Sequence, residues 1–140
     1  MSDLNAAVYD ILSTTSAISA IVGGRIRPDA LDQNEIIPAV VFWRVSGTSE
    51  NTINGSVSGL ARSRVTIESY SESRSEANDV AEQIRIALIN ARGTYAGTQV
   101  RNCLIDTHQQ QFVENPNDGN SQMRYVTSQD FTFFYIEDVI

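Results

Sequence analysis

The first twenty residues carry apolar side chains at the spacing of an α-helix. The apolar positions recur at intervals of three and four, which places on one face Leu4, Ala7, Val8, Ile11 and Leu12. The hydroxyl run Ser13–Ser16 offers a second set of capping residues, so residues 3–22 fit either one helix or two. In both cases Gly23 is expected to end the helical segment.

Two stretches in the middle of the chain predict strands. Residues 39–46 follow Pro38 and are nearly all apolar, which is typical of a strand buried on both faces, with Arg44 as the exception. Residues 60–70 alternate instead, with Val65 and Ile67 on one side. The opposite side of this second strand is polar and consists of Arg62, Arg64 and Glu68.

The segments around these two strands contain turn-forming residues. Pro28 and the polar residues 29–35 predict a loop before the first strand. Residues 47–59 contain Asn54-Gly55 and predict a hairpin connection or a long mobile tip between the strands. We therefore expect the two strands to be antiparallel neighbours.

The second half of the chain predicts a helix and two further strands. Ser73 and Glu76 form a capping box before a helix whose apolar face is Ala77, Val80, Ala81, Ile84, Leu88 and Ala91. Strands are expected at 99–107 and 123–136, separated by a turn-rich loop over 109–122. Alternation in the last strand sends Phe131, Phe133 and Tyr135 to one face, as a core or, less simply, as a base-stacking platform.

The order of these elements is α-β-β-α-β-β, which predicts the α+β class. We expect a mainly antiparallel four-stranded sheet with two main helices on one face. A length of 140 residues fits one domain spanning residues 1–140. No stretch approaches the ~20 apolar residues that a membrane span needs, so no membrane contact is expected.

Composition and charge narrow the possible partners. The net charge of −7 argues against tight wrapping of nucleic acid, which depends on cations that neutralise phosphates. All ten basic residues are Arg, which is enriched at protein interfaces, although drift in genome composition explains the bias equally well. The single cysteine, Cys103, excludes an internal disulfide.

Candidate catalytic and metal sites are weak. Cys103 lies five residues before the only histidine, His108, so on one strand the two side chains would face opposite sides. Asp29, Asp32 and Glu35 are spaced for a flexible, solvated loop rather than for a cation site. We therefore predict a protein that is not an enzyme and has no cofactor and no metal.

Several segments, taken in order, resemble the tail completion proteins of long-tailed bacteriophages, also called tail terminator or tail-to-head joining proteins. The matching segments are Ile21-Val22-Gly23-Gly24-Arg25-Ile26, Ile37-Pro38-Ala39-Val40-Val41-Phe42-Trp43, Gly59-Leu60-Ala61-Arg62, the Ser/Ala-Glu helix and the late aromatic strand. The resemblance implies one tail-terminator-like, ring-forming domain. It also implies a virion protein made in the host cytoplasm, with no catalytic residues.

The resemblance further implies a set of partners. Such a subunit forms a ring, usually a homo-hexamer, that caps the tail tube, ends its polymerisation and joins it to the connector or stopper on the head side. DNA passes through the lumen without specific binding. Which phage carries it, whether the tail contracts, which ring face meets the tube and the state of the free protein stay open.

Two sets of residues are predicted to make contacts in this assembly. The subunit interface is assigned to Arg44, Arg62, Arg64 and Glu68. The loops that contact partners are assigned to Asn51, Asn54, Gly55, Asn115, Asn117 and Asp118. An exposed face with an internal pair between Glu68 and Arg62 or Arg64 is the alternative for the first set.

Three other functions remain alternatives from the sequence. One is a different neck or head-completion protein of a phage. Another is a small dimeric ligand-binding or regulatory α+β module. The third, a hydrolase, would need His108 as its base.

Overall fold

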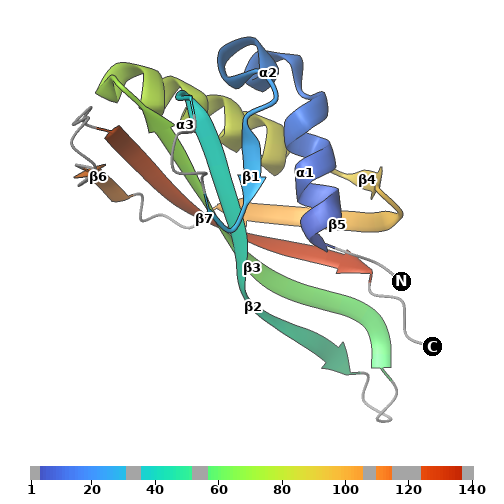
Figure 1. Ribbon diagram of the computed structural model, residues 1–140. Coiled ribbons are helices and arrows are strands. Elements are labelled where there is room, and N and C mark those ends of the chain that lie inside the picture. Colours follow the sequence, from blue (N-terminus) through green and yellow to red (C-terminus); the bar gives the residue numbers. More distant parts are fainter. Residues whose placement is uncertain (1–3, 31–35, 52–56, 106–109, 115–123, 137–140) are drawn as a thin grey trace.

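The computed structural model describes residues 4–30, 36–51, 57–105, 110–114 and 124–136 (Figure 1). Its helices are α1 (Leu4–Thr14), α2 (Ser16–Val22) and α3 (Arg74–Ile89). Its strands are β1 (Ile26–Pro28), β2 (Ala39–Asn51), β3 (Val57–Ser71), β4 (Gly93–Tyr95), β5 (Thr98–Ile105), β6 (Gln110–Glu114) and β7 (Arg124–Ile136).

The strands form one mixed sheet that curls into a half-barrel (Figure 1). The order is β1-β2-β3-β7-β5-β4, and β6 pairs with the part of β7 that β5 leaves uncovered. Only the β1–β2 pair is parallel among these described strands. The expected four-stranded, mainly antiparallel sheet with two main helices is therefore wrong, because the described residues form one mixed sheet of seven strands, together with three helices.

The missed strands are short. β1 and β4 have three residues each, and β6 has five, which is too short for a two-residue alternation to be visible. β1 ends at Pro28, where the sequence predicted the start of a loop, and β6 occupies part of the predicted loop 109–122. Each is held by pairing with a longer strand rather than by its own propensity.

The helical segment at the N-terminus is two helices, which resolves the alternative that the sequence left open. Thr15 has extended backbone angles, with φ −80° and ψ 111°. Its Oγ1 donates a 2.6 Å hydrogen bond to the carbonyl of Ile11, and Thr14 Oγ1 does the same to Asp10. Both hydroxyls bond back to carbonyls four residues earlier, a pattern that competes with continuation of the helix. Gly23, at φ 60°, ends α2 as predicted.

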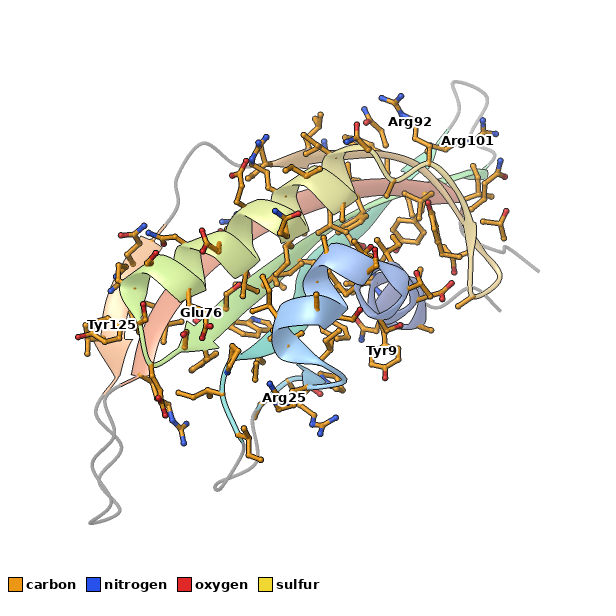
Figure 2. The ribbon with its side chains drawn as sticks, turned by 90° about the horizontal axis from the view of Figure 1, so that it is seen from above. Tyr9, Arg25, Glu76, Arg92, Arg101 and Tyr125 are labelled. Atoms are coloured by element: carbon orange, nitrogen blue, oxygen red, sulfur yellow. The ribbon has the colours of Figure 1, made fainter. Side chains whose placement is uncertain are left out.

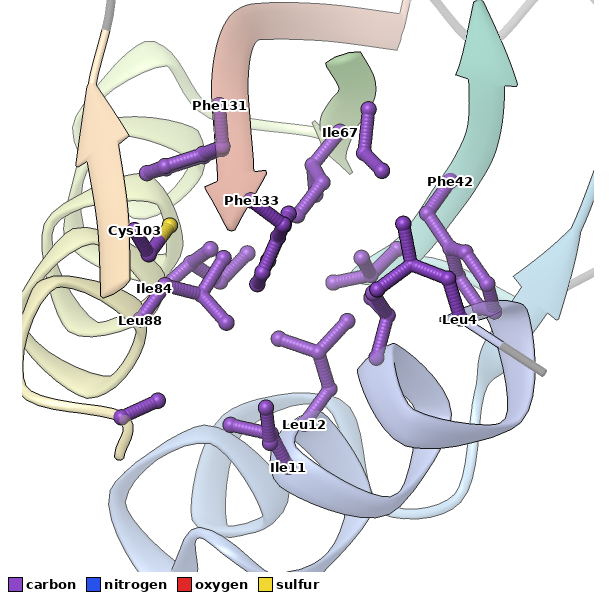
Figure 3. Close-up of a cluster of buried hydrophobic side chains, with 14 of the residues drawn as sticks. Leu4, Ile11, Leu12, Phe42, Ile67, Ile84, Leu88, Cys103, Phe131 and Phe133 are labelled. Atoms are coloured by element: carbon purple, nitrogen blue, oxygen red, sulfur yellow. The ribbon is translucent and has the colours of Figure 1, made fainter. Parts of the chain in front are cut away.

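The core lies between the three helices and one face of the sheet (Figures 1 and 2). Figure 3 shows Phe131 and Phe133 of β7 in one cluster with Ile84 and Leu88 of α3, and Cys103 of β5 belongs to the same core. The prediction that Phe131, Phe133 and Tyr135 face a core is confirmed, since all three side chains are buried.

The start of α3 is fixed by a capping box that includes one more serine. Ser73 Oγ accepts a hydrogen bond from the amide of Glu76, as the sequence predicts. The Glu76 carboxylate does not close the box directly. It accepts a 2.6 Å hydrogen bond from Ser71 Oγ, which in turn accepts one from the Ser73 amide. The last residue of β3 thus joins the strand to the helix.

The β2–β3 pair forms a ribbon that is longer than predicted. The two strands pair from Ala39↔Tyr70 to Asn51↔Val57, so most of the interval 47–59 is strand, and residues 52–56 lie outside the described part. The ladder shifts between Arg44 and Ser46, which makes Val45 the extra residue of a β-bulge. The antiparallel hairpin pairing of these strands is confirmed.

The two faces of β7 allow a direct test of the core. We expect Phe133→Ala to lower the free energy of unfolding by about 3–5 kcal/mol, because it empties a fully buried position. Phe134→Ala, the matched control, removes the same ring from the half-exposed neighbouring position and should cost roughly 1 kcal/mol or less. Urea denaturation measures both. Equal losses would contradict the assignment of the two faces.

Candidate functional site

The side of the sheet opposite the helices carries a continuous polar and aromatic surface, which we call the open face. Its central residues alternate with the core residues along β2, β3 and β7. The register places Trp43 opposite Thr66, and Thr66 opposite Asp130. The open face as described comprises Trp43, Arg62, Arg64, Thr66, Glu68, Tyr70, Arg124, Ser128, Asp130, Thr132 and Phe134, and the buried Val41 lies beneath it.

The centre of the open face is an ion pair between neighbouring strands. Arg64 Nη2 lies 2.5 Å from Asp130 Oδ2, and Thr66 Oγ1 donates a 2.7 Å hydrogen bond to Asp130 Oδ1. Partial burial by itself would raise the pKa of the Asp130 carboxyl. The hydrogen bonds from Thr66 and Arg64, together with the Arg64 charge, outweigh that effect and lower the pKa below its ordinary value. The ion pair and the hydrogen bond thus link β3 to β7 on the open face.

Two adjoining hollows flank this pair. One has a volume of about 490 Å³ and is lined by Trp43, Arg64, Thr66, Glu68, Gln110, Ser128 and Asp130. The other has a volume of about 560 Å³ and is lined by Asp29, Ala30, Val41, Trp43, Arg44, Glu68, Tyr70 and Arg124. They share Trp43 and Glu68, and Tyr70 donates a 2.9 Å hydrogen bond to the Glu68 carboxylate.

The chemistry of these hollows suits protein contacts. Trp43 and Tyr70 supply apolar rings with polar tips, while cations and carboxylates lie beside them, a combination that is enriched at interfaces. Among the described residues, no group of three His, Cys, Asp or Glu side chains could hold a metal ion. The open face therefore offers recognition groups without a cluster of metal ligands in the part of the chain described.

The four predicted interface residues lie on or beside the open face. Arg62 and Arg64 are exposed on β3, and Glu68 is half-buried between the two hollows. Arg44 is exposed on β2 next to the bulge and borders the larger hollow. Their contact with a neighbouring subunit stays a prediction.

Asp130 is the functional candidate that the sequence interpretation missed. Its partner Arg64 is 66 positions away in the chain, so no local motif joins them. The available signal was the alternation of β7, which puts Asp130 on the face opposite to Phe131 and Phe133.

The predicted partner loops are mostly outside the described residues. Asn51 ends β2, opposite Val57 of β3. Asn54 and Gly55, and likewise Asn115, Asn117 and Asp118, lie outside the described part of the chain. Their contact with partners also stays a prediction.

The residues considered for catalysis do not form a site in the described part. Cys103 is 2% exposed in the core, and burial raises the pKa of its thiol to about 12. Such a thiol carries almost no thiolate at neutral pH, so it is a poor nucleophile. His108, Asp32 and Glu35 lie outside the described residues, and Asp29 is exposed at the end of β1.

Comparison with known proteins identifies the family. The family model described as tail completion protein gp17 matches residues 6–128. The chain belongs to this family. It is accordingly a structural protein of the bacteriophage virion with a role in the tail, and the resemblance seen in the sequence is confirmed.

A solved structure shares the fold of this tail completion protein. A chain from the virion of a native gene transfer agent (GTA) particle superposes with a TM-score of 0.68 at 15% identity, covering 94% of each chain. No curated protein matches the sequence. Within the described residues, no helix has the length and apolar character needed to cross a membrane.

The ion pair on the open face makes stability depend on pH. The folded pKa of Asp130 lies below its ordinary value of 3.8, so the carboxylate stabilises the fold above that pH. This contribution is lost as the pH falls through the folded pKa. Asp130→Asn should therefore have a lower free energy of unfolding than the native chain at pH 7. This difference in unfolding free energy should shrink below about pH 4. Urea denaturation over a pH series measures it.

The matched control is Glu82→Gln on α3. A hydrogen bond from Arg85 lowers the pKa of Glu82 too, but this pair lies on the helix surface in solvent. Its removal should change the unfolding free energy much less at every pH. If the difference in unfolding free energy between Asp130→Asn and the native chain did not vary with pH, the charge of Asp130 would not be what stabilises the fold.

Proposed function

We propose that this chain is a ring-forming tail terminator, which caps the finished tail tube, ends its polymerisation and joins it to the connector or stopper of the head. The family match over residues 6–128 carries the proposal. A cap acts by occupying a surface, and a broad face of mixed charges and aromatic rings is suited to that task.

A homo-hexamer is the ring size that the dimensions of the chain favour. We take residues 1–140 as one domain, whose expected radius of gyration is ~14 Å, equivalent to a sphere ~37 Å across. Six touching spheres leave a hole about one sphere diameter wide, enough for duplex DNA. Four spheres leave only ~15 Å by the same geometry.

The open face supplies the proposed contacts between subunits. Arg44, Arg62, Arg64 and Glu68 are assigned to the interface because Arg is the cation that interfaces favour and its planar fork pairs with carboxylates. Arg64 already holds Asp130 within its own subunit. A carboxylate from a neighbour would extend this pair into a network, which is more stabilising than an isolated exposed pair.

Passage of DNA follows from the charge of the whole chain. A net charge of −7 repels phosphates, so a lumen lined by this protein would let DNA pass without specific binding. The tail tube, the head-side stopper and further copies of this chain are the proposed partners. No catalytic step is part of this function.

Deletion of the gene tests the proposal. We expect DNA-filled heads beside unjoined tails, many of them longer than normal, because a cap acts only after both parts exist. Electron microscopy of lysates counts the particles and measures tail length. Supplying the native chain in trans should restore joined particles of normal length.

The opposite phenotype would overturn the terminator role. Loss of capsid assembly or of DNA packaging would assign the protein to the head side of the neck. Complementation with Ile86→Arg serves as the control, because it changes an exposed residue of α3 that belongs to neither the open face nor a sheet edge. This variant should restore joining as well as the native chain does.

A further inference from the structure

Two strands of the described sheet are each paired along only part of one side. β1 covers β2 only at Val40–Phe42, so β2 from Trp43 to Asn51 is a sheet edge within the described residues. β4 covers β5 only at Thr98–Val100, so the residues 101–105 form another such edge. A sheet edge can add a further strand through its backbone amides and carbonyls, although on the β5 edge the Cys103 amide already donates a hydrogen bond to Asn102 Oδ1.

The two edges lie at the same height in the sheet, on its opposite sides. The register of the three intervening ladders, β2–β3, β3–β7 and β7–β5, shows this. Arg44 lies opposite Val65, which lies opposite Phe131, which lies opposite Ile105. Two residues further along β2, Ser46 leads in the same way through Arg64 and Thr132 to Leu104.

The strands at the two edges run in opposite directions. β2 is antiparallel to β3, β3 to β7 and β7 to β5, so β2 and β5 point opposite ways. When a rotation about an axis along the strands brings the β2 edge of one copy to the β5 edge of the next, the new ladder is therefore antiparallel. This is the stronger of the two modes of strand pairing.

Each edge also exposes an apolar side chain. Val45 of β2 and Leu104 of β5 are both 52% exposed, and they lie within one residue of the same height in the sheet. A β-bulge lies at each edge, at Val45 and at Arg101. Bulges at sheet edges hinder pairing with an arbitrary strand, so a strand that adds here has to fit the local bend.

We propose that the β2 edge of one copy pairs with the β5 edge of the next copy, with Val45 and Leu104 packed at the joint. The contact is heterologous, since it joins two different surfaces, and repetition by rotation closes a ring. The sheet would then run continuously from subunit to subunit, with the open faces on one side. The proposal rests on the proposed ring and adds an edge-to-edge contact to the open-face contacts proposed above for Arg44, Arg62, Arg64 and Glu68.

The polarity of the contact can be tested by mixing two variants. Val45→Arg blocks the β2 edge and leaves the β5 edge intact, while Leu104→Arg does the reverse. For each variant alone, the dissociation constant of self-association should rise about tenfold or more relative to the native chain, because the joint would bury an unpaired charge. At concentrations where the native chain assembles, each variant should therefore be monomeric. Mixed together they should form a 1:1 dimer that grows no further. Native mass spectrometry at matched concentrations detects each species.

Ile86→Arg is again the matched control. Ile86 is 41% exposed on α3, away from both edges, so this variant should assemble like the native chain. Since all three replaced residues are exposed, each variant should keep the unfolding midpoint that the native chain has at a concentration where it is monomeric. An unchanged midpoint shows that the variant folds.

A crosslinking experiment locates the contact without depending on the affinity between subunits. In the variant Val45→Cys with Leu104→Cys, a short bis-maleimide should link copies into a ladder that ends at the ring. Each single cysteine variant should give no ladder. The native Cys103 can remain, because it is buried and its thiol pKa is about 12.

Specific results would overturn the proposal. The proposal would be overturned by assembly of both arginine variants at the native level, or by dimers of either variant alone. It would also be overturned if the mixture gave no 1:1 dimer and the double-cysteine variant gave no 45–104 crosslink. Absence of association by the native chain, both at high concentration and on isolated tail tubes, would also overturn the proposal. The deletion phenotype does not depend on which edges meet, so the terminator role can stand when this proposal fails.

Discussion

The long antiparallel pairing of β3 with β7 is the constraint on which the rest of the structure depends. The two strands stay in one unbroken register from Leu60↔Ile136 to Ser71↔Tyr125. A slip of one residue would turn Val65 and Phe133 to solvent and Arg64 to the core. This register therefore fixes at once which face the helices cover, which residues form the open face and the height at which the two sheet edges lie.

The helix α3 is held on this pair by two kinds of contact. Its second half packs Ile84 and Leu88 into the apolar core. Its first half rests on polar groups of the sheet, where Asn78 Oδ1 accepts a 2.9 Å hydrogen bond from Thr127 and the carbonyl of Ala81 accepts one from Gln129. Apolar packing is non-directional, whereas these hydrogen bonds are satisfied in one placement of the helix, so they add specificity to the packing.

Long periodic segments were predictable from the sequence, and elements held by tertiary pairing were not. The face of α3 and the alternation of residues 60–70 are visible because each repeats over ten or more positions. β6 is a strand only because Gln110–Glu114 pairs with β7. The same limit applies to the site. Arg64 was found from its own strand, but Asp130 was missed because only the β3–β7 register brings the two together.

This dependence on pattern explains how the fold can be kept with little sequence identity. The gene transfer agent chain shares the fold at 15% identity. Alternation in two strands and one apolar stripe on a helix are met by many residue combinations, since cores tolerate extensive hydrophobic exchange when volume and pattern are kept. A protein that works by presenting a rigid face and two strand edges, as proposed here, needs the placement of these surfaces more than any single side chain. Its function then constrains the register of β3 and β7 more strongly than the identity of the residues on them.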